Sequence, residues 1–422
     1  MSRDVSVVSV DAANAEVVGR IASARAFLID VRPASDVIPA LGANELLHAG
    51  PPLAGWDEAC GALRGAIAGT LFQLGRIRSL DMAERVVASG EIPLSPANDR
   101  NALATYGGVL SDRTPLLVVE NRTTGVRAFA ALNEGRGRAL RYGANDPETL
   151  TRLSWLEGEF AELLAGALRL SGGIDVFGIL AQALHMGDDG HSRQKAASAL
   201  FLNAIAPFLV ETGCEKGQLA RALRFMAQNE IFFLPITMAS AKCALASAAG
   251  VPNSTVVTCM AVNGVRFGIK ISGLGDQWCT APLPTVHGHY FEGYGPEDAN
   301  PVIGDSEIAE TFGLGAFAMS AAPALARYVG GTPEEARRLS MEMYSIAVAE
   351  HQRFTVPALS FRGTPMGIDA RKVIETGLEP IFNTGIAHRE PGVGQIGAGF
   401  GRAPIACFRG AIELLSNNPI SA

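Results

Sequence analysis

The chain has 422 residues, more than one hydrophobic core usually serves, so its length predicts two or three domains or lobes. Hydrophobic residues make up 48% of it and charged residues 18%, below the roughly 25% of an average soluble domain, which predicts a large buried area and a homo-oligomer. The formal net charge of −7 and the lack of a Lys/Arg run exclude a nucleic-acid binder, because phosphate neutralisation needs a concentrated basic face.

Cysteine spacing and hydropathy indicate a cytoplasmic protein without a membrane span. The six cysteines form no C-x-x-C pair, which predicts reduced, mostly buried thiols. The first thirteen residues lack a basic segment followed by an apolar stretch, so we expect no secretion. The most apolar stretch, Ile231–Gly250, carries Lys242 at its centre and predicts a buried helix.

The first predicted unit, residues 1–142, mixes strands and helices in an N-terminal α/β lobe. Its predicted elements are a helix from Asp11, a strand at Ala26–Val31, helices at Trp56–Leu74 and Ser79–Ser89, and a hairpin of Leu116–Glu120 and Val126–Ala130.

The second predicted unit, residues 143–250, is an inserted all-helical domain. Asp146 followed by Pro147 is a strong helix start, and few β-branched runs interrupt the pattern that follows.

The third predicted unit, residues 251–422, is a C-terminal α/β lobe. Asn263-Gly264 predicts a hairpin whose two turn residues both have positive φ. Thr332 begins a capping box and predicts a helix through Ala349. The fold class is therefore α+β, with mixed α/β lobes around a helical insertion.

The densest polar and glycine-rich segment is Asn383–Gly399. Gly392, Gly394 and Gly397 spell G-x-G-x-x-G, but too little chain follows for a dinucleotide-binding β-α-β unit. A nest of backbone N–H groups beside His388 and Arg389 would suit phosphate or a carboxylate. The alternative is a tight glycine-rich connection between lobes.

A second cluster lies at His185–Arg193. We expect Gly187 and Gly190 to break the helix there, so that His185 and His191 can converge with the carboxylates of Asp188 and Asp189. Such a cluster would allow a metal ion or a general base held by a carboxylate. Equally, an aspartate could simply cap the following helix.

Three shorter signals carry less weight. His287 and His289 would share one face of an exposed strand, and Asp305 and Ser306 precede a helix that they could cap or whose N-terminus could contact a ligand. A literal S-x-R-T at Ser111–Thr114 matches the carbamoyl-phosphate loop of ordinary transcarbamylases, but no His-Pro follows and we treat it as coincidence.

Several longer motifs resemble one bacterial family, the oxamate carbamoyltransferase subunits of allantoin catabolism, of the AllG type. The motifs are HAGPP (48–52), LVVEN (117–121), HMGDDGH (185–191), ANPVIGDSEIAET (299–311), GIDARKVIETG (367–377) and NTGIAHREPGVGQIGAG (383–399). They follow one another in collinear order over nearly the whole chain.

The resemblance implies a subunit of a multi-subunit enzyme that exchanges a carbamoyl group between a ureido acid such as oxalurate and phosphate, giving carbamoyl phosphate and oxamate. It also implies a partner subunit that is similar to acyl-CoA ligases. From the sequence we assign no cofactor and no resident metal ion to the chain.

Carbamoyl transfer needs cations and oriented N–H donors around the reacting carbonyl and the phosphate. We therefore expect His388, Arg389 and the Gly392–Gly399 loop with Gln395 to bind phosphate or polarise the carbonyl. Further candidates are Asn383 as an amide donor, His185, Asp188 and His191 for acid/base work, Arg193 for a substrate carboxylate, and Asp305 and Ser306 for substrate contact.

One departure separates the chain from the family pattern, because Ala97-Asn98-Asp99 stands where the family typically has Cys-His-His. Two other functions therefore stay open: a non-catalytic scaffold in such a complex, and a metal-dependent amide hydrolase using its histidines.

Overall fold

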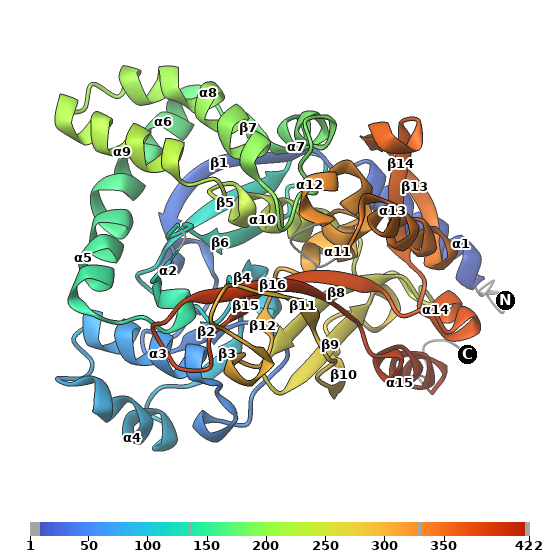
Figure 1. Cartoon of the computed structure of the whole chain (residues 1–422), viewed down its shortest axis with the longest axis horizontal. Coiled ribbons are helices and arrows are strands. Elements are labelled where there is room, and N and C mark those ends of the chain that lie inside the picture. The colour runs from blue at the N-terminus through green and yellow to red at the C-terminus, as the bar shows by residue number, and fades with distance from the viewer. Residues whose placement is uncertain (1–8, 136, 327–330, 418–422) are drawn as a thin grey trace, which may run out of the picture.

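The computed structural model describes residues 9–135, 137–326 and 331–417. Helices surround several small sheets (Figure 1), which confirms the α+β class. The helices are α1 (Val10–Ala22), α2 (Ala34–Val37), α3 (Gly61–Gln73), α4 (Ala83–Ala88), α5 (Pro147–Trp155), α6 (Ala161–Ser171), α7 (Val176–His185), α8 (Lys195–Glu211), α9 (Lys216–Gln228), α10 (Leu234–Ala246), α11 (Ile308–Phe312), α12 (Pro323–Ala326), α13 (Pro333–Glu342), α14 (Ala370–Thr376) and α15 (Ile405–Ser416). In the described ranges no helix is long and apolar enough to cross a membrane.

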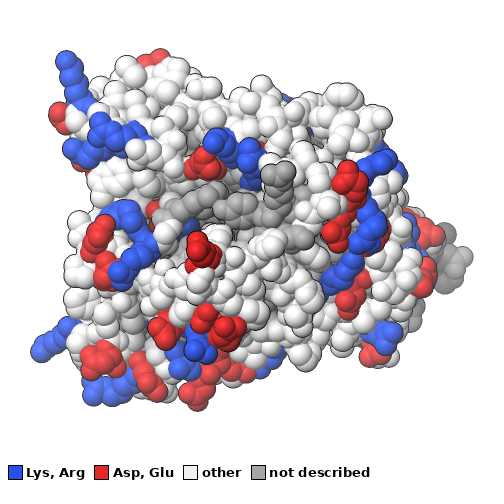
Figure 2. Space-filling model, in the orientation of Figure 1, with Lys and Arg blue, Asp and Glu red and all other residues white. Residues whose placement is uncertain are grey.

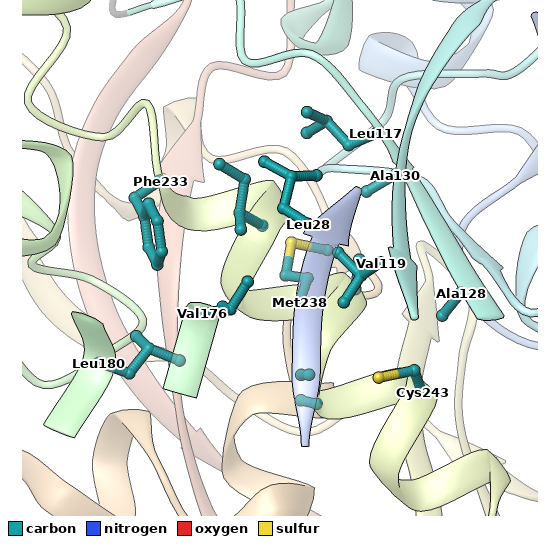
Figure 3. Close-up of a cluster of buried hydrophobic side chains, with 14 of the residues drawn as sticks. Leu28, Leu117, Val119, Ala128, Ala130, Val176, Leu180, Phe233, Met238 and Cys243 are labelled. Carbon is teal, nitrogen blue, oxygen red and sulfur yellow. The ribbon is translucent and has the colours of Figure 1, made fainter. Parts of the chain in front are cut away.

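The first sheet has the strand order β4-β6-β5-β1-β7. Its strands are β4 (Ala102–Leu103), β6 (Arg127–Ala131), β5 (Pro115–Asn121), β1 (Ala26–Pro33) and β7 (Ile174–Asp175). The predicted hairpin is confirmed, with Leu117 opposite Ala130. Figure 3 shows side chains of β1, β5, β6 and α7 meeting those of α10, the helix predicted to be buried. Because α10 is apolar on nearly every face, it lies inside the protein against this sheet.

The second sheet has the order β10-β9-β8-β12. Its strands are β10 (Cys279–Pro282), β9 (Arg266–Ile271), β8 (Val257–Asn263) and β12 (Ile303–Gly304). Strand β8 is buried at every position, and its residues are apolar apart from Thr258 and Asn263. The predicted Asn263-Gly264 hairpin is present, but of these two residues only Gly264 has positive φ. Asn263 instead ends β8, and its Oδ1 accepts the N–H groups of Val265 and Arg266.

The glycine-rich tail forms strands, where the sequence suggested a nest or a connection. Strands β11 (His287–Tyr290), β16 (Gln395–Arg402) and β15 (Ile381–Ala387) form an antiparallel sheet whose long hairpin crosses the middle of Figure 1. A Cβ at Gly399 would lie 2.3 Å from the carbonyl oxygen of His287, so glycine is required for β11 to approach. The remaining pairs are antiparallel β13 (Ala347–Val356) with β14 (Arg362–Ile368) and parallel β2 (Leu46–His48) with β3 (Leu94–Pro96).

Helix starts were predicted better than helix ends. Asp146 accepts the N–H of Thr149 and Thr332 accepts that of Glu335, as their capping patterns require. However, α13 ends at Glu342, and the chain enters strand β13 at Ala347, so the predicted helix through Ala349 is too long by about two turns. The pairing of β13 with β14 overrides the local helical pattern there.

The largest hydrophobic cluster contains residues from β1 and β5, from α6 to α10 and from α11. The helical segment thus shares its core with the first sheet, and the proposed division at 142/143 and 250/251 stays a prediction. Short helix α11 contacts both α10 and β8. It therefore lies where the first sheet's core meets the second sheet, and it brings Glu310 there.

Candidate active site

An imidazole and a carboxylate form the centre of the candidate site. Nδ1 of His191, in the loop between α7 and α8, lies 2.8 Å from Oε1 and 3.0 Å from Oε2 of Glu310 on α11. Both side chains are buried, with His191 4% exposed. Since Glu310 occupies Nδ1, the opposite ring nitrogen, Nε2, is the one available to a ligand.

The loop that carries His191 is organised by Asp189. Gly187 and Gly190 have positive φ and α7 ends at His185, so the predicted break in the helix is confirmed. The carboxylate of Asp189 accepts the backbone N–H groups of His191 and Arg193, at 3.0 and 2.8 Å.

Strand β15 closes the site from the other side. The backbone N–H of Asn383 donates to Glu310 Oε1 at 3.1 Å, and its side-chain Nδ2 donates to Asp189 Oδ2 at 2.9 Å. The buried carboxylates of Asp189 and Glu310 therefore connect three segments that are distant in the sequence, namely the His191 loop, α11 and β15.

A cavity of about 340 Å³ opens beside His191, and we call it the His191 cavity. Of the residues predicted from sequence, His191, Ser306 and Gln395 line it. Tyr106, another lining residue, is held at φ 53, an uncommon conformation for a bulky residue and one that is frequent at functional sites. The other polar lining residues include Thr105, Asn133, Arg141, Ser192 and Thr384.

Two of these residues offer buried donors. The side chain of Arg141 is buried, since the residue is 4% exposed, and its Nη2 donates to the carbonyl oxygen of Gly135. Its Nη1 lies 3.9 Å from Oε1 of Glu134 and makes no hydrogen bond within the described chain. Asn133 is 3% exposed, and its Nδ2 also lacks a partner there. Oδ1 of Asn133 accepts the N–H of Gly135 and the amide of Asn229, which fixes the orientation of its amide. Buried donors of this kind favour an oxygen-rich ligand.

The surrounding charges make His191 a cation. Burial lowers the pKa of His191, but the Glu310 carboxylate outweighs it and raises that pKa to about 9. Burial raises the pKa of Glu307 to about 8, and neither oxygen of its carboxyl group has a hydrogen-bond partner in the described chain. At neutral pH the site therefore holds an imidazolium against Glu310 and a Glu307 carboxyl that is largely neutral.

Asp188 and Arg193 lie on the far side of the His191 loop. Oδ2 of Asp188 accepts the N–H of Ala197 in the first turn of α8, so this aspartate does cap the helix, as the plainer interpretation held. Burial raises the pKa of Asp188 to about 6, and Nε of Arg193 lies 3.6 Å from its Oδ1. Neither residue lines the His191 cavity.

The remaining sequence candidates lie apart from that cavity. His185 is exposed and its Nε2 lies 2.9 Å from Oγ1 of Thr355. His388 sits in the turn after β15, where its Nδ1 accepts the N–H of Glu390, and Arg389 is exposed. Gly392 and Gly394 have positive φ in the same turn, and Gly397 lies within β16.

The carboxylate of Asp305 is held by hydrogen bonds from other parts of the chain. Its carboxylate accepts the N–H groups of Gly50 and Ala104 and the amide of Asn98, so the predicted side-chain cap of α11 is wrong. Burial raises the pKa of Asp305 to about 6. Asn98, which replaces part of the family's Cys-His-His, thus binds a buried carboxylate.

The sequence analysis missed Glu310, Asn133 and Arg141 as site residues, and it placed Asp189 in the histidine cluster without giving it a role of its own. Asp189 and Glu310 lie inside motifs that were noticed, yet nothing local indicated that Glu310 would reach a histidine 119 residues away. In the described part of the chain, no group of three or more His, Cys, Asp or Glu side chains has an arrangement that could hold a metal ion.

Comparisons with known proteins agree over nearly the full length. The family model described as oxamate carbamoyltransferase subunit AllG matches residues 92–306. The chain is 43% identical over 413 residues to the oxamate carbamoyltransferase subunit AllG of Escherichia coli (strain K12), covering 97% of this chain and 98% of that protein. The chain belongs to the AllG family.

Two further AllG-like relatives carry no activity in their names. Uncharacterized protein YahG of Escherichia coli (strain K12) is 42% identical over 95% of this chain and 85% of that protein. A crystal structure of a conserved protein of unknown function from Enterococcus faecalis V583 matches with a TM-score of 0.94 at 42% identity, covering 96% of this chain and 97% of that one. The AllG fold is thus shared by the solved structure, and the resemblance found in the sequence is confirmed.

Proposed function

We propose that this chain is a catalytic subunit of a carbamoyltransferase that exchanges a carbamoyl group between a ureido acid such as oxalurate and phosphate. Carbamoyl phosphate and an amido acid such as oxamate are the products in one direction. Support comes from the name of the Escherichia coli relative and from the chemistry of the His191 cavity.

The observation that carries the proposal is the His191–Glu310 pair. A histidine kept cationic by a buried carboxylate, with its second nitrogen beside a cavity, is suited to hold an anion such as phosphate. Arg141 and Asn133 line the same cavity, and each has a buried side-chain nitrogen without a partner in the described chain that is suited to donate to a further oxygen.

In this proposal His191 donates a hydrogen bond from Nε2 to an oxygen of phosphate or of the phosphoryl group of carbamoyl phosphate. Negative charge on that group changes as the carbon–oxygen bond to the carbamoyl carbon forms or breaks. Donors fixed in a buried site stabilise such charge without having to reorganise. Arg141 and Asn133 complete the set of donors, and Glu310 keeps the imidazole ring oriented.

The test uses the complex formed with the chain's partner subunit, which the family resemblance expects to be similar to acyl-CoA ligases. Release of phosphate from carbamoyl phosphate and oxamate is measured for the wild type and for His191→Gln. We expect a loss of about 100-fold or more, the size seen when one such donor is removed. His185→Gln is the matched control, because its ring is exposed and apart from the cavity.

The same assay separates catalysis from a scaffold role. If His191→Gln assembles normally with the partner, as judged by gel filtration, and keeps wild-type turnover, then the chain does not contribute this site to catalysis and the proposal is wrong.

A further inference from the structure

A second and larger cavity, of about 420 Å³, adjoins the first, and the proposed function does not use it. We call it the Glu157 cavity. Thr105, Asn133 and Arg141 line both cavities, so the two cavities adjoin. Arg141 and Asn133 each have a buried side-chain nitrogen, Nη1 and Nδ2, that lacks a hydrogen-bond partner in the described chain.

The backbone places Glu157 in this cavity by an unusual turn. Between α5 and α6 the chain makes one turn of π-helix, Leu156–Phe160, a feature often found at functional sites. Glu157 is thereby directed toward α3, where Nε2 of Gln73 donates to its Oε2 at 3.1 Å. Its other oxygen makes no hydrogen bond within the described chain and is left as an acceptor.

A second carboxylate and a guanidinium contribute to the same cavity. Glu134 lies in the lining, where it accepts the backbone N–H groups of Leu140 and Arg141 at 2.7 and 3.1 Å. Burial, with the nearby charge of Glu134, raises the pKa of Glu157 to about 7. Arg113, from the S-x-R-T segment, is an exposed member of the lining.

The S-x-R-T segment does not form a phosphate site here. Oγ1 of Thr114 accepts the backbone N–H of Ser111, and the two hydroxyl groups lie 3.2 Å apart, so both are engaged within their own turn. Of this segment, only the Arg113 guanidinium remains for a ligand.

We infer that the Glu157 cavity binds a small carboxylic acid that carries a primary amide or ureido group. Its N–H donors face Glu157, its carbonyl oxygen faces the nitrogens of Arg141 and Asn133, and its carboxylate faces Arg113. The identity of the acid as the carbamoyl acceptor rests on the proposed function, whereas binding itself does not. The two reactants then occupy adjoining cavities that share Thr105, Asn133 and Arg141.

The experiment compares two ligands that differ in N–H donors. Oxamate and pyruvate share a single carboxylate and an adjacent carbonyl oxygen, but pyruvate has a methyl group where oxamate has its NH2 group. Titration calorimetry on the full-length chain should show about tenfold or greater preference for oxamate, the worth of one hydrogen bond to a charged group. Glu157→Met, which keeps the volume and removes both acceptors, should abolish that preference, and Glu157→Gln should keep part of it.

Two controls keep the result interpretable. Ser154→Ala also changes a lining residue that contacts Gln73, and it should keep the wild-type preference. Binding of inorganic phosphate should be unaffected by Glu157→Met and lost in His191→Gln, which tests the proposed function separately.

Equal binding of oxamate and pyruvate by the wild type, absence of oxamate binding, or an unchanged preference in Glu157→Met would each overturn the inference. Loss of phosphate binding in Glu157→Met would show that the variant disturbs both cavities. In that case the Glu157→Gln variant is the deciding test. If this variant binds phosphate normally and prefers oxamate as strongly as the wild type does, the inference about the Glu157 cavity is also wrong.

Discussion

The side-chain amide of Asn383 donates to the carboxylate of Asp189 at 2.9 Å, joining residues 194 positions apart in the sequence. Both side chains are fully buried. The bond ties the glycine-rich β15–β16 hairpin to the loop that carries His191. Because Asp189 also accepts backbone N–H groups of that loop, a single carboxylate fixes the position of the histidine.

Replacing Asn383 with Leu should therefore destabilise the protein. The change keeps the approximate volume but removes the shorter of the two hydrogen bonds to Oδ2 of buried Asp189, which keeps only the N–H of Ser192 at 3.4 Å, at a cost of about 1–3 kcal/mol. Urea unfolding measures the loss. Asn417→Leu, at an exposed position after α15, should change the free energy of unfolding by less than about 0.5 kcal/mol. If the two substitutions changed the free energy of unfolding equally, the hydrogen bond between Asn383 and Asp189 would contribute nothing measurable to stability.

Gly315 should resist substitution because of its contact with the His191–Glu310 pair. A Cβ there would lie 2.1 Å from Oε1 of Glu310, and the residue has φ 60. Gly377 has φ 69 in the left-handed region and nothing within 4 Å of such a Cβ, so it is a control for backbone strain without a close contact. Gly377→Ala should cost about 1–2 kcal/mol.

Gly315→Ala should cost a further 1–3 kcal/mol or so, from overpacking, in the same urea experiment. It should also lower phosphate release by the complex, because Glu310 must move away from His191. If both alanine variants lost the same free energy of unfolding, a Cβ at position 315 would not clash with Glu310, which would contradict the close packing seen in the structure.

Glu307 should make stability depend on pH. Burial raises its pKa from 4.5 to about 8 in the folded protein, so the unfolded chain releases this proton first as pH rises. The stability that the group contributes is complete below pH 4.5 and is lost as pH rises toward 8. Glu307→Gln removes the titration.

The free energy of unfolding of Glu307→Gln should therefore rise relative to that of the wild type between pH 5 and pH 8. We expect a change of about one to a few kcal/mol. Urea unfolding of both proteins across that range measures it. A constant difference across the range would mean that Glu307 titrates alike in the folded and unfolded states.

Local patterns in the sequence predicted much of the fold. The β5–β6 and β8–β9 hairpins and the caps at Asp146 and Thr332 depend on neighbouring residues, and the structure contains all of them. The end of α13 was missed because the pairing of β13 with the following strand β14 outweighs the local helical pattern. The strands of the glycine-rich tail were missed because β16 also pairs with β11, which is distant in the sequence.

The candidate site could be predicted only in part for the same reason. His191, Ser306 and Gln395 were singled out by local motifs and do line one cavity. The partner of His191 could not be predicted, since Glu310 is brought to it by the packing of α11 against α10 and β8. Polar residues that were prominent in the sequence, such as His388 and Arg389, fall in a turn outside that cavity.

The most direct test of the His191 cavity is nuclear magnetic resonance of the full-length chain with isotope-labelled histidine, using His191→Gln to assign the signal. The His191 ring should titrate near pH 9, and its Nε2 signal should shift when inorganic phosphate is added at pH 7.5. A ring that titrates near its ordinary pKa of about 6.5 and does not respond to saturating phosphate would contradict the assignment of His191 as the cation that holds the anionic substrate.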